Sequence, residues 1–451
     1  MAARAQMESH LPPEARSKID QIVGQSMEMA RTPSVSIAIV KEGEIAYLRA
    51  YGDARFEPRT AAAPSMRYSI GSISKQFTAT AMLMLVEEGK LSLEDSVSRF
   101  LPSLTRAKEI TIRQLLSHTS GYQDYWPQDY VFPDMLKPVT AQEIMERWAR
   151  KPLDFEPGTR WQYSNTGFVI AGAIIEKASG EPLVQFLRER IFSPLGMRSV
   201  LNVDGERLSD SDPTGYLRYA LGPFRVAPRE GTGWLFAAGE LAMSAEDLAK
   251  WDIAMIGQKL LKPDSYRVMQ TETLLKNGLG TNYGLGIGVR AESGHRVLEH
   301  GGGVSGFTTE NVIFPDDRAA VVVLTNQDAF GSVANIARKI SAILFAGDEA
   351  LKSRKEQEAR KIFESLQHGT IDRNLFTANG NSYFNDEAIQ DFQGSLGPLG
   401  PPQLFSQVED NLRGGMEFRA FRVQFPSRTL VVTEREMPDG KIEQYQVEIQ
   451  E

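Results

Sequence analysis

The sequence predicts an α+β fold: an antiparallel sheet flanked by helices with an inserted all-helical block, followed by a small separate α+β domain. Strand-like runs occur near residues 34–51 and again near 283–325. The residues between them are mostly helical patterns broken by Pro- and Gly-rich loops. A charged stretch at 348–360 then precedes a second region of helices and strands. Strands from both ends of the first region are therefore expected to share one sheet.

The first elements follow from apolar periodicity and turn residues. Residues 14–30 have an amphipathic helical pattern, which Pro33 ends. The runs 34–40 and 45–51 are β-branched or aromatic and are joined by Lys-Glu-Gly-Glu, which is typical of a hairpin. A helix is then expected over 72–88, where apolar residues follow helical spacing.

The inserted block and the returning strands come next. Helices are expected at 140–149, 167–178, 244–256 and 333–345, and strands at 283–289, 295–299, 308–314 and 318–325. Because the last of these helices closes the unit, residues 1–350 are predicted to form one domain.

Residues 351–451 are predicted to form a small α+β accessory domain. The charged stretch at 348–360 is interpreted as a helical linker or as the first helix of this unit. Short helices and then hairpin-like runs at 416–425, 429–434 and 442–448 follow. This order faintly resembles NTF2-like domains. Packing, substrate gating or dimerisation is expected of the unit before a second activity.

Composition excludes several classes of protein. A net charge of −8 leaves no basic surplus to neutralise phosphates, so no nucleic acid partner is expected. No run approaches the roughly 18 apolar residues of a membrane span. Cysteine is absent, which excludes disulfides, thiolate zinc sites and a cysteine nucleophile. The histidines lack ligand spacing, so neither a metal nor another cofactor is expected.

The sequence leaves the cellular compartment open. The segment from Ala3 to Ala5 has the small-x-small form of a signal-peptidase site, although no apolar segment precedes it. One interpretation is the remnant of a removed export signal, which would make the protein periplasmic or secreted. The other is an Ala-rich start without meaning, which leaves a cytoplasmic location open.

Ser72 and Lys75 are the first candidate catalytic pair. They lie three positions apart where a predicted helix begins, so the amine can reach the hydroxyl. Free backbone N–H groups and the positive end of the helix dipole favour an oxyanion there. Desolvation and the same dipole should lower the proton affinity of Lys75 and make it a usable base. The alternative is a serine N-cap followed by a surface lysine.

Several further segments resemble one enzyme family when taken together. They are Ser-Ile-Ser-Lys-Gln-Phe-Thr-Ala at 72–79, Thr-Ile-Arg-Gln-Leu-Leu-Ser-His-Thr-Ser-Gly at 111–121, Phe-Glu-Pro-Gly at 155–158, Tyr-Ser-Asn at 163–165, Tyr-Gly-Leu-Gly at 283–286 and His-Gly-Gly-Gly at 300–303. Their order resembles the signatures of the class C β-lactamase and penicillin-binding-protein family of serine hydrolases, which has D-aminopeptidase-like and esterase-like members. The resemblance covers about residues 15–347 and implies a β-lactamase/transpeptidase-like fold.

The resemblance implies a role for each matched side chain. Ser72 would be the nucleophile and Lys75 its base. Tyr163 would lie opposite Ser72 and carry its proton to the leaving group. Asn165 would bind the substrate carbonyl and contact Lys75; its alternative role is that of a turn former.

The glycine-rich segment at 301–303 is implied to border the substrate. The oxyanion hole would use the backbone N–H groups of Ser72 and Gly303. Gly302 and its neighbours would let a substrate backbone approach the strand edge closely.

His300 departs from the family pattern, because members that act on β-lactams usually have lysine at this position. The permanent charge of lysine attracts a substrate carboxylate, whereas histidine is mostly uncharged at neutral pH. Histidine here resembles D-aminopeptidases, D-amino-acid amidases and esterase-like members. It indicates amide or ester substrates without an adjacent carboxylate.

Several aromatic residues and one further histidine lie in or near these segments. Tyr125 and Trp126 would form one apolar wall of the site, and Trp234 and Phe236 another. The alternative is that these aromatics only pack loops onto the helical block. His118 is expected to be a buried hydrogen-bonding residue and not a base.

Three functions remain open from the sequence. The first is a serine hydrolase that acts through an acyl-enzyme on small ester or amide substrates, D-amino-acid derivatives included. The second is a β-lactamase or a cell-wall DD-peptidase. The third, from another class, is a penicillin-binding sensor or a non-catalytic scaffold. The expected partner is a small-molecule ester, amide or peptide substrate, and the oligomeric state is not given.

Overall fold

The computed structural model describes residues 11–128, 130–292, 295–328, 330–345, 349–413 and 415–449. The chain forms two compact units, of which the second is built mainly from residue 345 onward. Independent domains with a boundary at residue 350 stay a prediction. The predicted signal-cleavage remnant at Ala3 to Ala5 lies outside the described residues.

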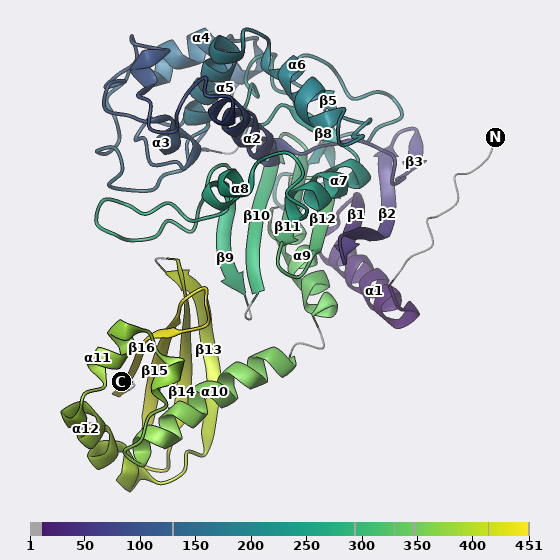
Figure 1. The fold of residues 1–451 in the computed structure, drawn as a ribbon. Coiled ribbons are helices and arrows are strands. Elements are labelled where there is room, and N and C mark those ends of the chain that lie inside the picture. The colour runs from purple at the N-terminus through teal and green to yellow at the C-terminus, as the bar shows by residue number, and fades with distance from the viewer. Residues whose placement is uncertain are drawn as a thin grey trace. The chain divides into compact units, whose positions relative to one another are not determined.

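The first unit is organised around a seven-stranded sheet in the order β3-β2-β1-β12-β11-β10-β9 (Figure 1). Its strands are β1 Ser34–Lys41, β2 Glu44–Phe56, β3 Arg59–Ala61, β9 Gly288–Glu292, β10 His295–Val304, β11 Phe307–Phe314 and β12 Ala319–Thr325. The central pair β1 and β12 is antiparallel, with Ile37 opposite Val323. This pairing confirms that strands from both ends of the region share one antiparallel sheet.

Helices cover both faces of this sheet. All of β12 is buried, and so is β1 from Ser34 to Val40, so neither face at the centre is open to solvent. The helices packed on the sheet are α1 Pro13–Ala30, α7 Ala245–Ile256 and α9 Phe330–Leu344. Ser244 caps α7, because its side chain accepts the backbone N–H of Asp247.

The inserted block lies between β3 and β9 along the chain. Its helices are α2 Ser74–Glu87, α3 Ile112–Leu116, α4 Ala141–Ile144, α5 Asn165–Ser179, α6 Leu183–Leu187 and α8 Pro263–Met269, with short 3₁₀- and π-helical segments before, between or after them. Short strands β4 Tyr68–Ser69, β5 Leu201–Asn202 and β8 Leu241–Met243 form a small sheet, and β6 Tyr216–Leu217 pairs with β7 Arg225–Val226. Helix α2 is buried from Ser74 to Leu85, so it is the central helix of the block.

The predicted strand at 283–289 is wrong over most of its length, because β9 begins only at Gly288. The preceding residues pack against other backbones instead. A Cβ atom on Gly284 would lie 2.1 Å from the carbonyl oxygen of Met269, and one on Gly286 would lie 2.6 Å from that of Lys75. Glycine is required at both positions, and these contacts bend the chain out of an extended strand.

The second unit has helices first and strands afterwards, as predicted. It contains α10 Glu349–Gln367, α11 Ala378–Tyr383, α12 Asp386–Leu396, β13 Leu404–Arg413, β14 Met416–Gln424, β15 Thr429–Glu436 and β16 Ile442–Ile449. The four strands form an antiparallel sheet in chain order. Phe363, Phe421, Val432 and Tyr445 are fully enclosed in its core.

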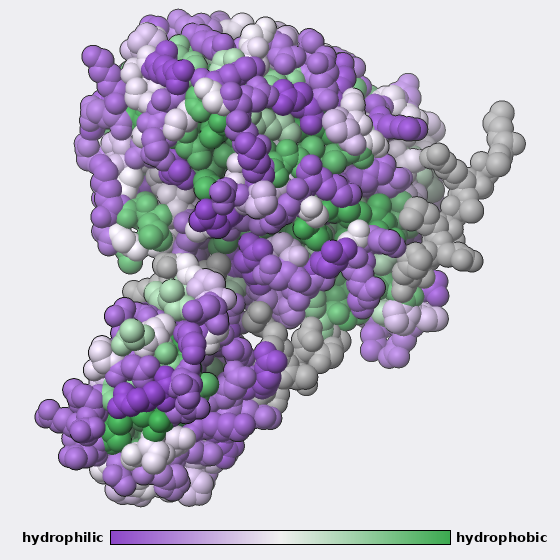
Figure 2. Space-filling view, in the orientation of Figure 1, coloured by the Kyte–Doolittle hydropathy of each residue, from purple (hydrophilic) through white to green (hydrophobic). Residues whose placement is uncertain are grey.

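Hydrophilic residues predominate on the face of the molecule in Figure 2, and apolar residues reach it in small groups. None of the helices in the described ranges combines the length and the apolar character that a bilayer crossing requires.

Candidate active site

Ser72 lies in the turn η1 Gly71–Ile73, directly before α2. This turn is pressed against strand β10. A Cβ atom on Gly71 would lie 2.6 Å from the backbone nitrogen of Gly303, and the φ angle of Gly71 is +52°. Only glycine fits this close approach comfortably. The contact places Ser72 at a cavity of about 240 Å³ that also borders β10.

Lys75 is completely buried one helical turn beyond Ser72. Its Nζ atom donates to Ser72 Oγ at 2.9 Å, to Asn165 Oδ1 at 2.8 Å and to the carbonyl oxygen of Ala238 at 2.7 Å. Burial lowers the pKa of Lys75 to about 7, while the charge of Asp124 acts in the opposite direction. Both the ammonium form and the free-amine form of Lys75 are therefore populated near neutral pH.

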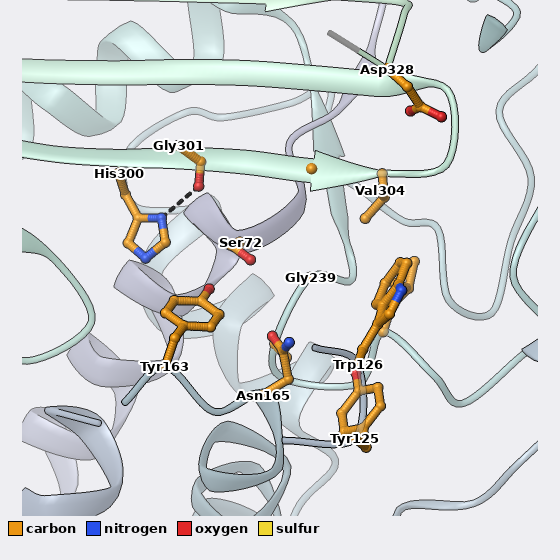
Figure 3. Close-up of a pocket in the computed structure, with 13 residues that line it drawn as sticks. Ser72, Tyr125, Trp126, Tyr163, Asn165, Gly239, His300, Gly301, Val304 and Asp328 are labelled. Atoms are coloured by element: carbon orange, nitrogen blue, oxygen red, sulfur yellow. Dashed lines mark hydrogen bonds between the residues drawn. The ribbon is translucent and has the colours of Figure 1, made fainter. Parts of the chain in front are cut away.

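Tyr163 stands beside this pair and lines the cavity. Figure 3 shows its hydroxyl directed toward Ser72. The Lys75 Nζ atom lies 4.9 Å from the centroid of the Tyr163 ring. On its other side the ring packs on His118, with the two centroids 4.2 Å apart. The three side chains predicted to move the proton are thus brought together.

Asn165 is held in one orientation by two charged neighbours. It is the first residue of α5, whose N-cap is Ser164. Its Oδ1 atom accepts from Lys75, while its Nδ2 atom donates to Asp124 Oδ1 at 3.2 Å and its backbone N–H to the same oxygen at 3.0 Å. The side-chain amide of Asn165 therefore cannot flip by 180° without losing both hydrogen-bond partners.

Asp124 is a site residue that the sequence analysis did not single out. Burial raises the pKa of its carboxyl, and hydrogen bonds from the backbones of Trp126 and Asn165 oppose that rise. The only signal in the sequence is a carboxylate within the aromatic segment 122–126. Its contact with Asn165 joins residues 41 positions apart, which local patterns do not reveal.

The end of β10 offers an open strand edge to the cavity. Strand β9 has five residues and β10 has ten, so the half of β10 that contains 301–303 continues past the end of β9. Gly301 and Gly303 line the cavity, whereas Gly302 is not among the lining residues. A Cβ atom on Gly302 would lie 1.9 Å from the carbonyl oxygen of Ile70. This glycine therefore allows the strand to pack on the segment before Ser72.

His300 lies at the cavity but is committed to protein partners. Its Nδ1 atom lies 2.6 Å from the carbonyl oxygen of Gly301, and its Nε2 atom 2.8 Å from the hydroxyl of Tyr283. Since a carbonyl only accepts, Nδ1 carries the proton and Nε2 accepts from Tyr283. Burial, helped by the charge of Lys75, lowers the pKa of His300 to about 3. The ring is therefore neutral at physiological pH.

The aromatic residues divide between the two predicted alternatives. Tyr125 and Trp126 line the cavity together with Leu235. Trp234 is buried and packs against Tyr125, with ring centroids 5.8 Å apart. The second wall is therefore formed by Leu235, and neither Trp234 nor Phe236 lines the cavity.

His118 is buried behind Tyr163, as expected. Its Nδ1 atom accepts the backbone N–H of Ser164 at 3.1 Å, and burial lowers its pKa well below the usual value. Within the described ranges no group of three or more metal-ligating side chains could hold an ion.

The sheet, the inserted helical block and the serine–lysine pair at the start of the central helix are together the arrangement of the serine acyl-transfer proteins that include β-lactamases and penicillin-binding proteins. The chain belongs to the Beta-lactamase family, whose family model matches residues 19–344.

Relatives of known name fall within the same class. D-aminopeptidase from Brucella anthropi is 28% identical over 347 residues, which are 76% of this chain and 65% of that protein. The chain thus spans slightly less than two thirds of that relative. Penicillin-binding protein 4* from Bacillus subtilis is 31% identical over 309 residues, 65% of this chain and 68% of that protein.

A solved structure agrees with these matches. D-amino acid amidase from Ochrobactrum anthropi SV3, complexed with D-phenylalanine, superposes with a TM-score of 0.64 at 26% identity. The match covers 74% of this chain and 99% of the amidase. None of these findings confirms the resemblance of the second unit to NTF2-like domains.

Proposed function

We propose that this protein is a serine hydrolase that acts through an acyl-enzyme on small amide or ester substrates, D-amino-acid derivatives included. The observation that carries the proposal is the buried Lys75 amine, which contacts the Ser72 hydroxyl and has a pKa of about 7. An amine with this pKa can accept the proton of the serine at neutral pH and return it later.

In the proposed reaction, neutral Lys75 accepts the Ser72 proton as Oγ forms a bond to the substrate carbonyl carbon. The carbonyl oxygen becomes an oxyanion and accepts hydrogen bonds from the backbone N–H groups of Ser72 and Gly303. Tyr163 gives its proton to the departing amine or alcohol and regains one from Lys75, so that the proton taken from Ser72 ends on the leaving group. Water then cleaves the acyl-enzyme by the reverse proton path. Asn165 binds the acyl-side carbonyl and helps to hold Lys75.

The environment of His300 supports substrates without a carboxylate next to the scissile bond. A neutral ring with both nitrogen atoms committed to Gly301 and Tyr283 offers no cation to such a carboxylate. The names of the relatives D-aminopeptidase and D-amino acid amidase support amide substrates of D-amino acids.

A second candidate is β-lactamase or DD-peptidase activity, which the similarity to Penicillin-binding protein 4* favours. Of the third candidate, a non-catalytic scaffold is disfavoured because Ser72, Tyr163 and Asn165 are all gathered around the Lys75 amine. A penicillin-binding sensor also needs Ser72, and deacylation separates it from a hydrolase.

The proposal is tested with p-nitrophenyl acetate and butyrate, D-alanine p-nitroanilide and nitrocefin, using wild type and Ser72→Ala. Turnover of esters or anilide, weak nitrocefin cleavage and no activity in Ser72→Ala are expected. Fast nitrocefin turnover would favour the second candidate, and a burst without turnover would favour the sensor. Activity that survives in Ser72→Ala would refute the assignment.

A further inference from the structure

The cavity at Ser72 has a carboxyl group at one end. Of the described residues that line it, Asp328 is the one that is ionised near neutral pH, since burial raises its pKa only to about 6 and lowers that of His300 to about 3. Figure 3 places His300 and Asp328 toward opposite ends of the part of β10 beside the cavity, with Val304 on the Asp328 side. A ligand along this strand therefore meets a neutral ring at one end and a carboxyl at the other.

The turn between β10 and β11 fixes this carboxyl and a second one behind it. The backbone N–H of Gly306 donates to Asp328 Oδ1 at 2.7 Å, and that of Ser305 donates to Glu230 Oε1 at 2.7 Å. Burial raises the pKa of Glu230, and the nearby charge of Asp328 adds to that rise. Two adjacent N–H groups thus hold Asp328 at one end of the cavity and Glu230 at the neighbouring cavity.

Neither acid forms an ion pair with a described lysine or arginine: the partner of Asp328 is the Gly306 backbone, and Arg229 acts on Glu230 only through its charge. The guanidinium of Arg229 donates instead to the backbone carbonyls of Val203 and Glu206. One backbone N–H uses a small part of the acceptor capacity of a carboxylate. Solvent reaches Asp328, so a ligand can reach it too.

We propose that this end of the cavity binds an ammonium group of the substrate, and that Asp328 is the residue that selects for it. The inference rests on the proposed acyl-enzyme function and adds the charge of the preferred substrate to it. Hydrogen bonds between a carboxylate and an ammonium group are among the stronger polar contacts in proteins. The ammonium belongs either to the N-terminal amino group or to a distal amine of the acyl group.

The test compares kcat/KM for D-alanine p-nitroanilide, N-acetyl-D-alanine p-nitroanilide and Nα-acetyl-D-lysine p-nitroanilide. Wild type should prefer a substrate with an ammonium group, and the preferred one identifies its position. In Asp328→Asn, which retains the oxygen that accepts from Gly306, this preference should fall by about tenfold. Asp210→Asn removes a carboxylate from the neighbouring cavity and should keep the wild-type preference.

A preference that is equal in wild type and Asp328→Asn would overturn the inference. An equal loss on all three substrates with a lowered Tm would also overturn it, because it would show a purely structural role at the turn.

Failure of the inference is separable from failure of the proposed function. Ser72-dependent turnover of p-nitrophenyl acetate without any ammonium preference would sink the inference alone. Calorimetric binding of D-alanine amide and N-acetyl-D-alanine amide to Ser72→Ala measures the same preference without turnover. Tighter binding of the free amine, lost in the double variant with Asp328→Asn, is the expected result.

Discussion

The Lys75 amine is enclosed on every side and donates to three oxygen atoms, one of which is the hydroxyl of Ser72. Lys75→Arg retains a cation that does not deprotonate at any accessible pH. We expect the acylation burst with p-nitrophenyl butyrate to slow by about a thousandfold, with Ser72→Ala as background and circular dichroism as the folding control. A burst at the wild-type rate would remove Lys75 from the proposed mechanism.

The charge of Asp124 makes the pH dependence testable. Because burial lowers the pKa of Lys75 to about 7, the free amine and hence kcat/KM should increase as pH rises through about 7. Asp124 opposes this lowering, so Asp124→Asn should lower the pKa further and move the acid limb to lower pH. A pH series on p-nitrophenyl acetate checks this.

Asp134→Asn is the matched control for that series, since Asp134 is exposed in the turn Pro133–Leu136. It should leave the acid limb in place. A limb that stays unmoved in Asp124→Asn as well would show that the two charges are not coupled.

At the residue level, the sequence predicts site residues that lie within one motif. It does not predict site residues whose role depends on contacts between distant segments. Ser72 and Lys75 are neighbours on one helical turn, so a serine and a lysine three positions apart can be recognised in the sequence itself. Asp124 and Asp328 were not predicted, because their importance depends on contacts with Asn165 and Gly306 across long sequence separations.

Among the elements, strand β10 depends on Gly302 for its position. A methyl group there would lie 1.9 Å from the carbonyl oxygen of Ile70, so one of the two backbones must shift. We expect Gly302→Ala to lower the free energy of unfolding by about 2 kcal/mol or more, measured by urea denaturation. Gly331→Ala in α9, where nothing lies within 4 Å, should be neutral or stabilising. Equal stability of the two variants would contradict this packing.

Elements were predictable where the apolar spacing and the turn residues of the local sequence specify them. The helix at 72–88 and the hairpin at 34–51 are of this kind, and both are present, the helix beginning as a short η1 turn. Strand β13 was missed because it is an edge strand whose Leu404 and Val408 are 43% and 50% exposed. Its regularity comes from its partner β14 and not from its own alternation.

For the whole molecule, the distribution of tryptophan allows the unfolding of the two units to be followed separately. All five tryptophans precede residue 252 and so report on the first unit. The second unit contains buried Arg419, which contacts Glu434 at 3.3 Å and Glu436 at 2.6 Å. Arg419→Met leaves buried Glu434 without its ion-pair partner, whereas Glu436 retains its contact with Lys355 at 2.9 Å. Loss of one partner from a buried pair costs about 3–5 kcal/mol.

We therefore expect Arg419→Met to produce an early transition in far-UV circular dichroism during urea unfolding, while the tryptophan fluorescence transition stays at its wild-type midpoint. Wild type supplies the reference for both signals. Coincident early transitions in the variant would show that the two units unfold cooperatively and would contradict their prediction as independent domains.

The contacts of Gly71 and Gly302 with the facing backbone have a consequence for how this protein can diversify. The segment before Ser72 is held against strand β10 by close backbone contacts at Gly71 and Gly302 and by Thr309, whose Oγ1 atom donates to the carbonyl oxygen of Ile70. Tyr125, Trp126 and Val304 line the cavity beside it. Substitutions at those three positions are therefore expected to change which ligands bind while the position of Ser72 Oγ stays the same. The residues that determine reactivity and those that determine substrate selectivity can in this way change independently during evolution.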